Sequence, residues 1–205
     1  MRATSLHTHP DRAIIHAELK QNSLLKNITD EQLAELESHL QVVDAAKNDF
    51  LLTQGDRDME QYFILEGLLK RVVSNPKGTK EMVLRFSSER GMETSYAAWR
   101  LKTPAPYSII ASTKSRVARV NMPAWVSFLD KYPDFKAIFE FEVMGLMGDI
   151  MAHTITLHLL NAPGRVHRFE RKHPDLFERI PKKELAAYLN LSAETLSRLK
   201  QRGKI

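Results

Sequence analysis

Residues 133–160 carry the longest uninterrupted helical pattern in the chain, and this pattern limits what the sequence can fold into. Pro133 suits the first turn of a helix, and the next proline is Pro163. About 28 residues with a rise of 1.5 Å each predict a helix roughly 40 Å long. Because such a helix is too long to pack only within a small unit, we expect part of it to contact a partner.

Two apolar faces run along this predicted helix. One follows the alternating spacing of four and three that is typical of a coiled-coil seam; it consists of Phe139, Val143, Leu146, Ile150, His153, Leu157 and Leu160. We expect this seam to face the same helix of a second copy, which predicts a homodimer. The other face, formed by Met144, Met147, Met151 and Ile155, is then expected to lie against the rest of the chain. A single long core helix is the alternative.

His153 gives the seam a testable property. Two imidazole rings near a two-fold axis repel each other when both are protonated, so dimer affinity is expected to fall below about pH 6.

Residues 42–120 have a different pattern, in which short apolar runs alternate with turn residues. The runs are 50–53, 62–65, 68–73, 81–86, 107–111 and 116–120. Asn75-Pro76-Lys77-Gly78 is typical of a hairpin loop, and Gly55 and Gly67 are expected at corners. Short strands at regular spacing predict a β-barrel or roll. Before them, residues 1–20 are polar and expected to be partly loose, and Thr29 to Gln32 form a capping box that begins a helix.

Residues 181–202 have the pattern of a helix-turn-helix. Leu185, Ala186 and Leu189 form one apolar stripe, and Asn190 tolerates the left-handed conformation that ends a helix. Ser192 can cap the second helix, which leaves the opposite face of that helix free for a partner. The pattern predicts DNA binding; a plain helix pair that closes a globular core is the alternative.

The charge distribution favours DNA binding. Residues 161–205 contain eleven Lys and Arg against five acidic residues, whereas the rest of the chain has a net charge of −1. A local cluster of positive charge is what phosphate neutralisation needs.

Composition excludes several other classes. The chain has no cysteine, which rules out disulfides and thiolate catalysis. Neither a signal-peptide pattern nor an apolar run of membrane-spanning length is present, so a cytoplasmic protein without a membrane partner is expected. No catalytic residue set stands out, so we do not expect an enzyme. The eight histidines lack a third ligand at suitable spacing, so neither a metal nor another cofactor is expected.

In order and spacing, four segments resemble the cyclic AMP receptor protein/FNR (Crp/Fnr) family of bacterial transcription regulators. They are Gln54-Gly55-Asp56, residues 62–70, residues 78–84 and residues 180–200. The resemblance implies an α+β fold with three parts: a cyclic-nucleotide-binding-like β-roll (a double-stranded β-helix or jelly roll) over residues 1–130, a dimerisation helix over 131–160, and a winged helix-turn-helix domain over 161–205. In this sequence the wing is expected to be short or absent. It implies double-stranded DNA and a second copy as partners, with RNA polymerase as a further candidate.

The family pattern also assigns roles within the recognition helix. It places Glu194, Ser197 and Arg198 at base edges, where arginine can bind guanine and a carboxylate can accept from cytosine. Ala193 departs from the pattern, because cyclic-AMP-type members often have arginine there. Phosphate contacts are expected from Lys182, Lys183, Ser192, Thr195, Lys200 and Arg202.

The effector site departs further from the family pattern. Its expected residues are Glu93, Thr94, Tyr107 and Ser108. The arginine that clamps the cyclic phosphate in the family is replaced here by Ala105 or Pro106, which removes a strong charge-assisted bond. We therefore expect an unidentified small-molecule effector, or none, rather than ordinary cyclic AMP. A ligand-binding or protein-interaction module whose terminal helices no longer bind specific DNA is the alternative function.

Overall fold

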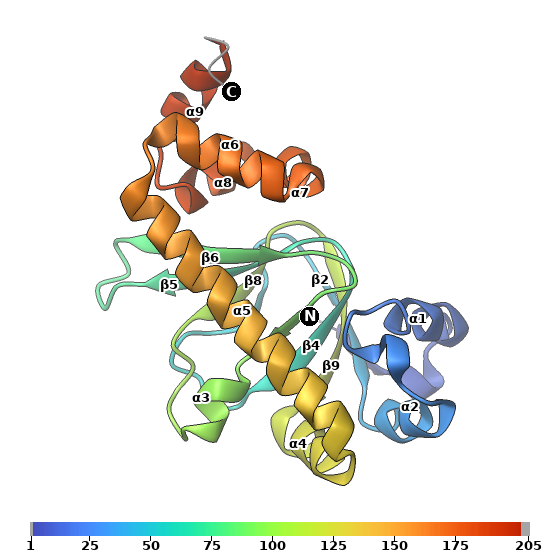
Figure 1. Cartoon of the computed structure of the whole chain (residues 1–205). Helices are drawn as coiled ribbons and strands as arrows, with labels where there is room; N and C mark the ends of the chain where they lie inside the picture. Colours follow the sequence, from blue (N-terminus) through green and yellow to red (C-terminus); the bar gives the residue numbers. More distant parts are fainter. Residues whose placement is uncertain (1, 202–205) are drawn as a thin grey trace.

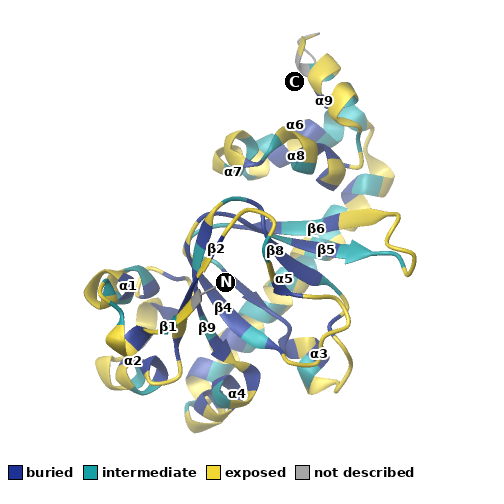
Figure 2. Ribbon diagram, turned by 180° about the vertical axis from the view of Figure 1, so that it is seen from behind, coloured by how far each residue is buried: buried dark blue, intermediate teal, exposed yellow. Residues whose placement is uncertain are grey.

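The computed structural model describes residues 2–201, without the side chains of Arg2 and Lys200. A β-roll occupies the N-terminal part, one long helix crosses it, and a group of short helices follows (Figure 1). Figure 2 shows that buried positions concentrate in the strands, while exposed positions are frequent on the last helix and at one hairpin tip. The predicted α+β fold with a β-roll, a long helix and C-terminal helices is confirmed.

Two antiparallel sheets form the roll. The first has the order β1-β2-β9-β4-β7, with strands Arg2–Ser5, Gln41–Ala45, Ser115–Asn121, Glu60–Glu66 and Met92–Thr94. The second has the order β3-β8-β5-β6, with strands Phe50–Leu52, Ser108–Ala111, Leu69–Ser74 and Glu81–Ser87. Each predicted strand run overlaps one of these strands, because alternation and turn residues are local signals.

Turn chemistry fixes two of the strand connections. The Asn75 side chain accepts from the backbone N–H groups of Thr79 and Lys80 at 2.9 and 3.1 Å, which closes the β5–β6 hairpin. Gly67, between β4 and β5, has φ +90°, and a Cβ there would overlap the backbone of Lys114 and Ser115. This corner therefore requires glycine.

The helices fall into three groups along the chain. The N-terminal group is η1 Leu6–Thr8, α1 Arg12–Leu19, η2 Leu25–Asn27 and α2 Asp30–Glu37. Those beside the roll are α3 Tyr96–Arg100, α4 Met122–Lys131 and α5 Pro133–Leu159. The C-terminal group is α6 Ala162–Lys172, α7 Pro174–Arg179, α8 Lys182–Tyr188 and α9 Ala193–Gln201. The capping box predicted at the start of α2 is present in full, with Thr29 and Gln32 each bonded to the other's backbone.

The prediction that residues 1–20 are partly loose is wrong for residues 2–20, which the structure describes. Strand β1 pairs with β2 at the edge of the first sheet, and Leu6, Ile15 and Leu19 are fully buried in the main core. Long-range burial gives this polar segment its order, and no local pattern in the sequence carried that information.

The C-terminal helices dock on the outer face of the second sheet. Leu68, Phe86 and Ile110 of the roll share one apolar cluster with Leu185 and Tyr188 of α8. Ionic contacts flank this cluster. Arg179 forms a bidentate pair with Glu89 at 2.6 and 2.9 Å, and Glu184 binds Lys70 at 3.0 Å and accepts from Ser112. The roll and the helix-turn-helix are therefore in direct contact.

Within residues 2–201, no helix combines the length and the apolar character that crossing a bilayer would require.

Candidate functional site

Helices α8 and α9 form the predicted helix-turn-helix. Asn190 has φ +53°, and the N–H of Leu191 donates to the carbonyl of Ala186 at 2.8 Å, which closes α8. Ser192 accepts from the N–H of Thr195 at 3.0 Å and so caps α9. Leu196 is 2% exposed and faces the C-terminal core. The local signals read from the sequence thus appear in the structure as expected.

The opposite face of α9 is open to solvent. Glu194, Ser197 and Arg198 are all exposed, and none of their side chains forms a hydrogen bond or ion pair with another described residue. Their donors and acceptors remain available for base edges. The structure therefore gathers the three predicted base-reading residues on one exposed helix face, and their contact with DNA stays a prediction.

The predicted phosphate contacts divide into three groups. Lys182 and Lys183 are exposed on the first turn of α8. Ser192 and Thr195 bond to each other, because the Ser192 hydroxyl donates to Thr195 Oγ1 at 2.9 Å. The side chain of Lys200 and the whole of Arg202 lie outside the described residues. The described members lie on the helix-turn-helix, and whether they bind phosphate stays a prediction.

The predicted dimer seam is wrong for Phe139. Phe139 is fully buried and packs edge-on against Tyr96 and Trp125, with ring centroids 5.0 and 5.3 Å apart. Val143 and Leu146 pack against the same core. Phe139 therefore packs against α4 and cannot face a second copy, whereas a partner contact of the half-buried Val143 and Leu146 stays a prediction. Ile150 and Leu157 are half-buried and Leu160 is 37% exposed, so for these residues a partner contact stays a prediction.

The residues expected to lie against the roll are instead exposed. Met144 and Met151 are each 63% exposed, and Met147 and Ile155 are each 51% exposed. Phe141 at 70% and Leu159 at 76% extend the same stripe at both ends. We call these six residues the α5 stripe. A contiguous exposed apolar patch of this kind marks an interaction surface.

His153 lies between α5 and α8. Its ring stacks on Tyr188 at 3.7 Å with the planes 5° apart, and its Nε2 is 3.0 Å from the carbonyl oxygen of Tyr188. Burial lowers the pKa of His153 to about 4, and the charge of Lys172 adds to this effect. The expected loss of dimer affinity through His153 protonation near pH 6 is therefore wrong, because the ring is neutral there and faces its own chain.

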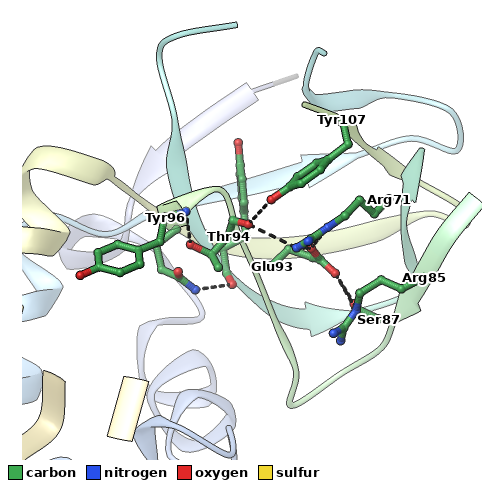
Figure 3. A network of polar contacts seen from close by, with 9 residues as sticks. Arg71, Arg85, Ser87, Glu93, Thr94, Tyr96 and Tyr107 are labelled. Carbon is green, nitrogen blue, oxygen red and sulfur yellow. Dashed lines mark hydrogen bonds and ion pairs between the residues drawn. The ribbon is translucent and has the colours of Figure 1, made fainter. Parts of the chain in front are cut away.

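Three of the four predicted effector residues, Glu93, Thr94 and Tyr107, gather inside the roll (Figure 3). Glu93 and Thr94 are 1% and 3% exposed, and the Tyr107 hydroxyl donates to the carbonyl of Thr94 at 2.7 Å. Ser108 lies apart from this group and accepts from the N–H of Gln54 at 2.9 Å. The Glu93 carboxylate is fully engaged: Arg71 and Ser87 donate to it, and Arg85 forms an ion pair with it at 3.1 Å.

The sequence pattern did not predict three residues of this network, namely Arg71, Arg85 and Ser87. Arg71 is 2% exposed, and its guanidinium lies 4.1 Å from the centroid of the Tyr107 ring. A signal existed, because Arg71 lies two positions after the buried Leu69 on β5 and so points to the same face. The charges of Arg71 and Arg85 outweigh the effect of burial and hold the pKa of Glu93 below its ordinary value.

Among residues 2–201, no group of three or more His, Asp or Glu side chains is placed to hold a metal ion.

Comparison with known proteins places this geometry in context. Residues 42–132 match the family model of the cyclic nucleotide-binding domain. A search of curated proteins found no match to the chain. Among solved structures, FixK2 from Bradyrhizobium japonicum is similar, with a TM-score of 0.69 and 15% identity over 80% of this chain and 86% of that one.

Two further structures share the architecture. CLP from Xanthomonas campestris, described as a c-di-GMP responsive global regulator, has a TM-score of 0.68 at 14% identity, covering 85% of this chain and 92% of its own. A CooA mutant from Carboxydothermus hydrogenoformans has a TM-score of 0.63 at 15% identity, covering 87% and 80% respectively. These neighbours are Crp/Fnr regulators; this chain shares their fold, and its residues 42–132 match the cyclic nucleotide-binding domain.

Proposed function

Starting from the Crp/Fnr fold of the chain, we propose that the protein is a homodimeric, sequence-specific DNA-binding transcription regulator. The observation that carries the proposal is the exposed face of α9, on which Glu194, Ser197 and Arg198 have no partner within the described residues. Arg198 can bind guanine O6 and N7, Glu194 can accept from cytosine N4, and Ser197 assists. The basic residues of 161–205 supply the sequence-independent attraction to phosphate.

In this proposal, the α5 stripe forms the interface between two copies of the chain. Two chains joined along α5 would present two copies of α9, and a two-fold axis makes them suited to an inverted repeat with half-sites about one helical turn apart. The three parts of the chain then have separate tasks: residues 1–130 sense, 131–160 dimerise, and 161–205 bind DNA.

The proposed effector is not ordinary cyclic AMP. Glu93, expected at the ribose of a cyclic nucleotide, already binds Arg71, Arg85 and Ser87. A nucleotide would have to displace those partners, and Ala105 and Pro106 offer no guanidinium for its phosphate.

Selection of bound sequences from a random duplex library tests the DNA proposal, followed by titration of Arg198→Ala on the selected site. We expect the substitution to cost about 1–3 kcal/mol there and to relax the preference for one guanine. Arg171→Ala, an exposed charge on α6, is the control and should weaken specific and random duplex equally. Equal loss for Arg198→Ala on both duplexes would refute the base-reading role. A specificity ratio near one for the wild type would favour a ligand-binding or protein-interaction module.

A further inference from the structure

A cavity of about 90 Å³ lies where the roll, the long helix and the helix-turn-helix domain meet. Its walls come from β6, α5, α6, α7 and α8, which converge in Figure 1. We call it the junction cavity. The cavity lies outside the Glu93 network of the roll. Arg85 connects the two, because it lines the cavity and also forms an ion pair with Glu93.

Aromatic rings form one side of the junction cavity. Tyr188 is central to them, because its ring centroid lies 5.5 Å from that of Phe86 and 5.3 Å from that of Phe169. His153 stacks on Tyr188 and also lines the space. Aromatic side chains that line a cavity favour a flat apolar group on the ligand.

Positive charge surrounds the junction cavity in excess. Four cationic side chains and one carboxylate line it, and these are Arg85, Arg165, Arg168, Lys172 and Asp149. The Asp149 carboxylate forms an ion pair with Lys172 at 2.8 Å, so it already has a partner.

Two of the remaining cations have no carboxylate partner. The Arg165 guanidinium donates only to backbone carbonyls, those of Leu160, Leu189 and Asn190, at 2.9 to 3.2 Å. The Arg168 side chain has no hydrogen bond or ion pair with any described residue. An anion placed between these two guanidinium groups would gain charge-assisted hydrogen bonds.

The size of the cavity limits the ligand. A cavity of about 90 Å³ limits the ligand to roughly one small ring and is too small for a nucleotide.

We propose that the junction cavity binds a small aromatic carboxylate, with the carboxylate on Arg165 and Arg168 and the ring against Tyr188 and Phe169. Tyr188 and Leu189 end α8 immediately before the turn that leads to α9. A ligand there would fix how the helix-turn-helix sits on the roll. This regulatory consequence rests on the proposed function, whereas the binding itself does not.

Calorimetric titration with benzoate, in the absence of DNA, tests the site. Benzyl alcohol and benzylamine serve as the neutral and cationic probes of matched shape. We expect saturable benzoate binding with a dissociation constant of about the millimolar order, as a ligand of this size permits, and much weaker binding of the other two. Absence of saturable benzoate binding, or equal binding of all three probes, would overturn the proposal.

Variants locate the site on the wild-type background. Arg168→Gln should weaken benzoate binding by roughly tenfold or more, because it removes a charge-assisted bond. Arg171→Gln, on the same helix but outside the lining, is the matched control and should bind as the wild type does. Ala152→Leu keeps every charge and fills the cavity from α5, so it should abolish binding in a folded protein, as checked by circular dichroism. Unchanged binding in both Arg168→Gln and Ala152→Leu would refute the assignment.

The two proposals fail separately. If benzoate does not bind in the DNA-free titration, the ligand proposal fails, but the Arg198→Ala experiment still tests the DNA proposal. Loss of sequence preference with benzoate binding intact would reject the DNA proposal alone.

Discussion

The Arg71–Glu93 pair allows the sharpest test of how the roll is held together. Replacing Arg71 by Met keeps most of the side-chain volume and removes the charge. The arginine is 2% exposed and the carboxylate 1%, and Arg71 Nε donates to Glu93 at 3.0 Å. The substitution also removes the bond to the carbonyl of Thr94 at 3.2 Å and the contact with the Tyr107 ring.

Breaking a buried ion pair by removing one partner costs about 3–5 kcal/mol. Arg85 still faces Glu93 at 3.1 Å in the variant, so we expect the lower end, about 3 kcal/mol. Against a typical folding free energy of about 5–15 kcal/mol, this loss is easily measured by urea denaturation. Arg57→Met, at an exposed arginine, is the control and should stay within about 0.5 kcal/mol of the wild type.

A double substitution separates the pair from simple loss of packing. Glu93→Gln added to Arg71→Met removes the carboxylate that lost its strongest partner. We expect the double variant to be more stable than Arg71→Met alone, because no underpaired charge remains buried. A stability of Arg71→Met within about 1 kcal/mol of the wild type at pH 7 would refute the reasoning.

The sign of the pH dependence follows from the pKa of Glu93. The pKa is lowered in the folded wild type, so ionised Glu93 contributes stability above its unfolded pKa of about 4.3, and this contribution is lost as the pH falls through the folded pKa. Removing Arg71 leaves burial to raise that pKa. The stability deficit of Arg71→Met should therefore be largest at neutral pH and above, and should shrink as the pH falls through the raised pKa of Glu93 in the variant.

Two further predictions concern α5. Met151→Asp places a charge in the α5 stripe and should raise the dimer dissociation constant by roughly a hundredfold in sedimentation experiments. The control Arg171→Asp, on α6, should leave this constant unchanged. An unchanged constant for Met151→Asp would exclude the stripe as the dimer interface. The lowered pKa of His153 means that the unfolded chain binds a proton more readily, so stability should fall as the pH decreases from about 6.5 to 4. His153→Phe should make this decline shallower in urea titrations, and an identical decline would show that His153 is not its source.

Local signals made most of the secondary structure predictable. Asn75 to Gly78 contains the residues that a hairpin needs, Thr29 and Gln32 cap each other, and Asn190 adopts the left-handed conformation that ends α8. Each of these depends on a few neighbouring residues, and so does the alternation that located the strands. The exposed face of α9 was predictable for the same reason, since one helix with a single apolar stripe has only one polar face.

The role of Arg71 was not predictable with the same ease. An arginine in a strand is usually exposed, and only its pairing with Glu93, 22 residues later in the chain, makes its burial favourable. The order of residues 2–19 was hidden as well, because the partner of β1 is β2, which begins at Gln41.

The sequence by itself determined that residues 133–159 form one long helix with two apolar faces, and that a helix-turn-helix follows it. Only the tertiary structure decided which face turns inward. Periodicity cannot rank two stripes of similar hydrophobicity, so the choice depended on shape. The ring of Phe139 fits between Tyr96 and Trp125, and this packing turns Met144, Met147 and Met151 to the outside.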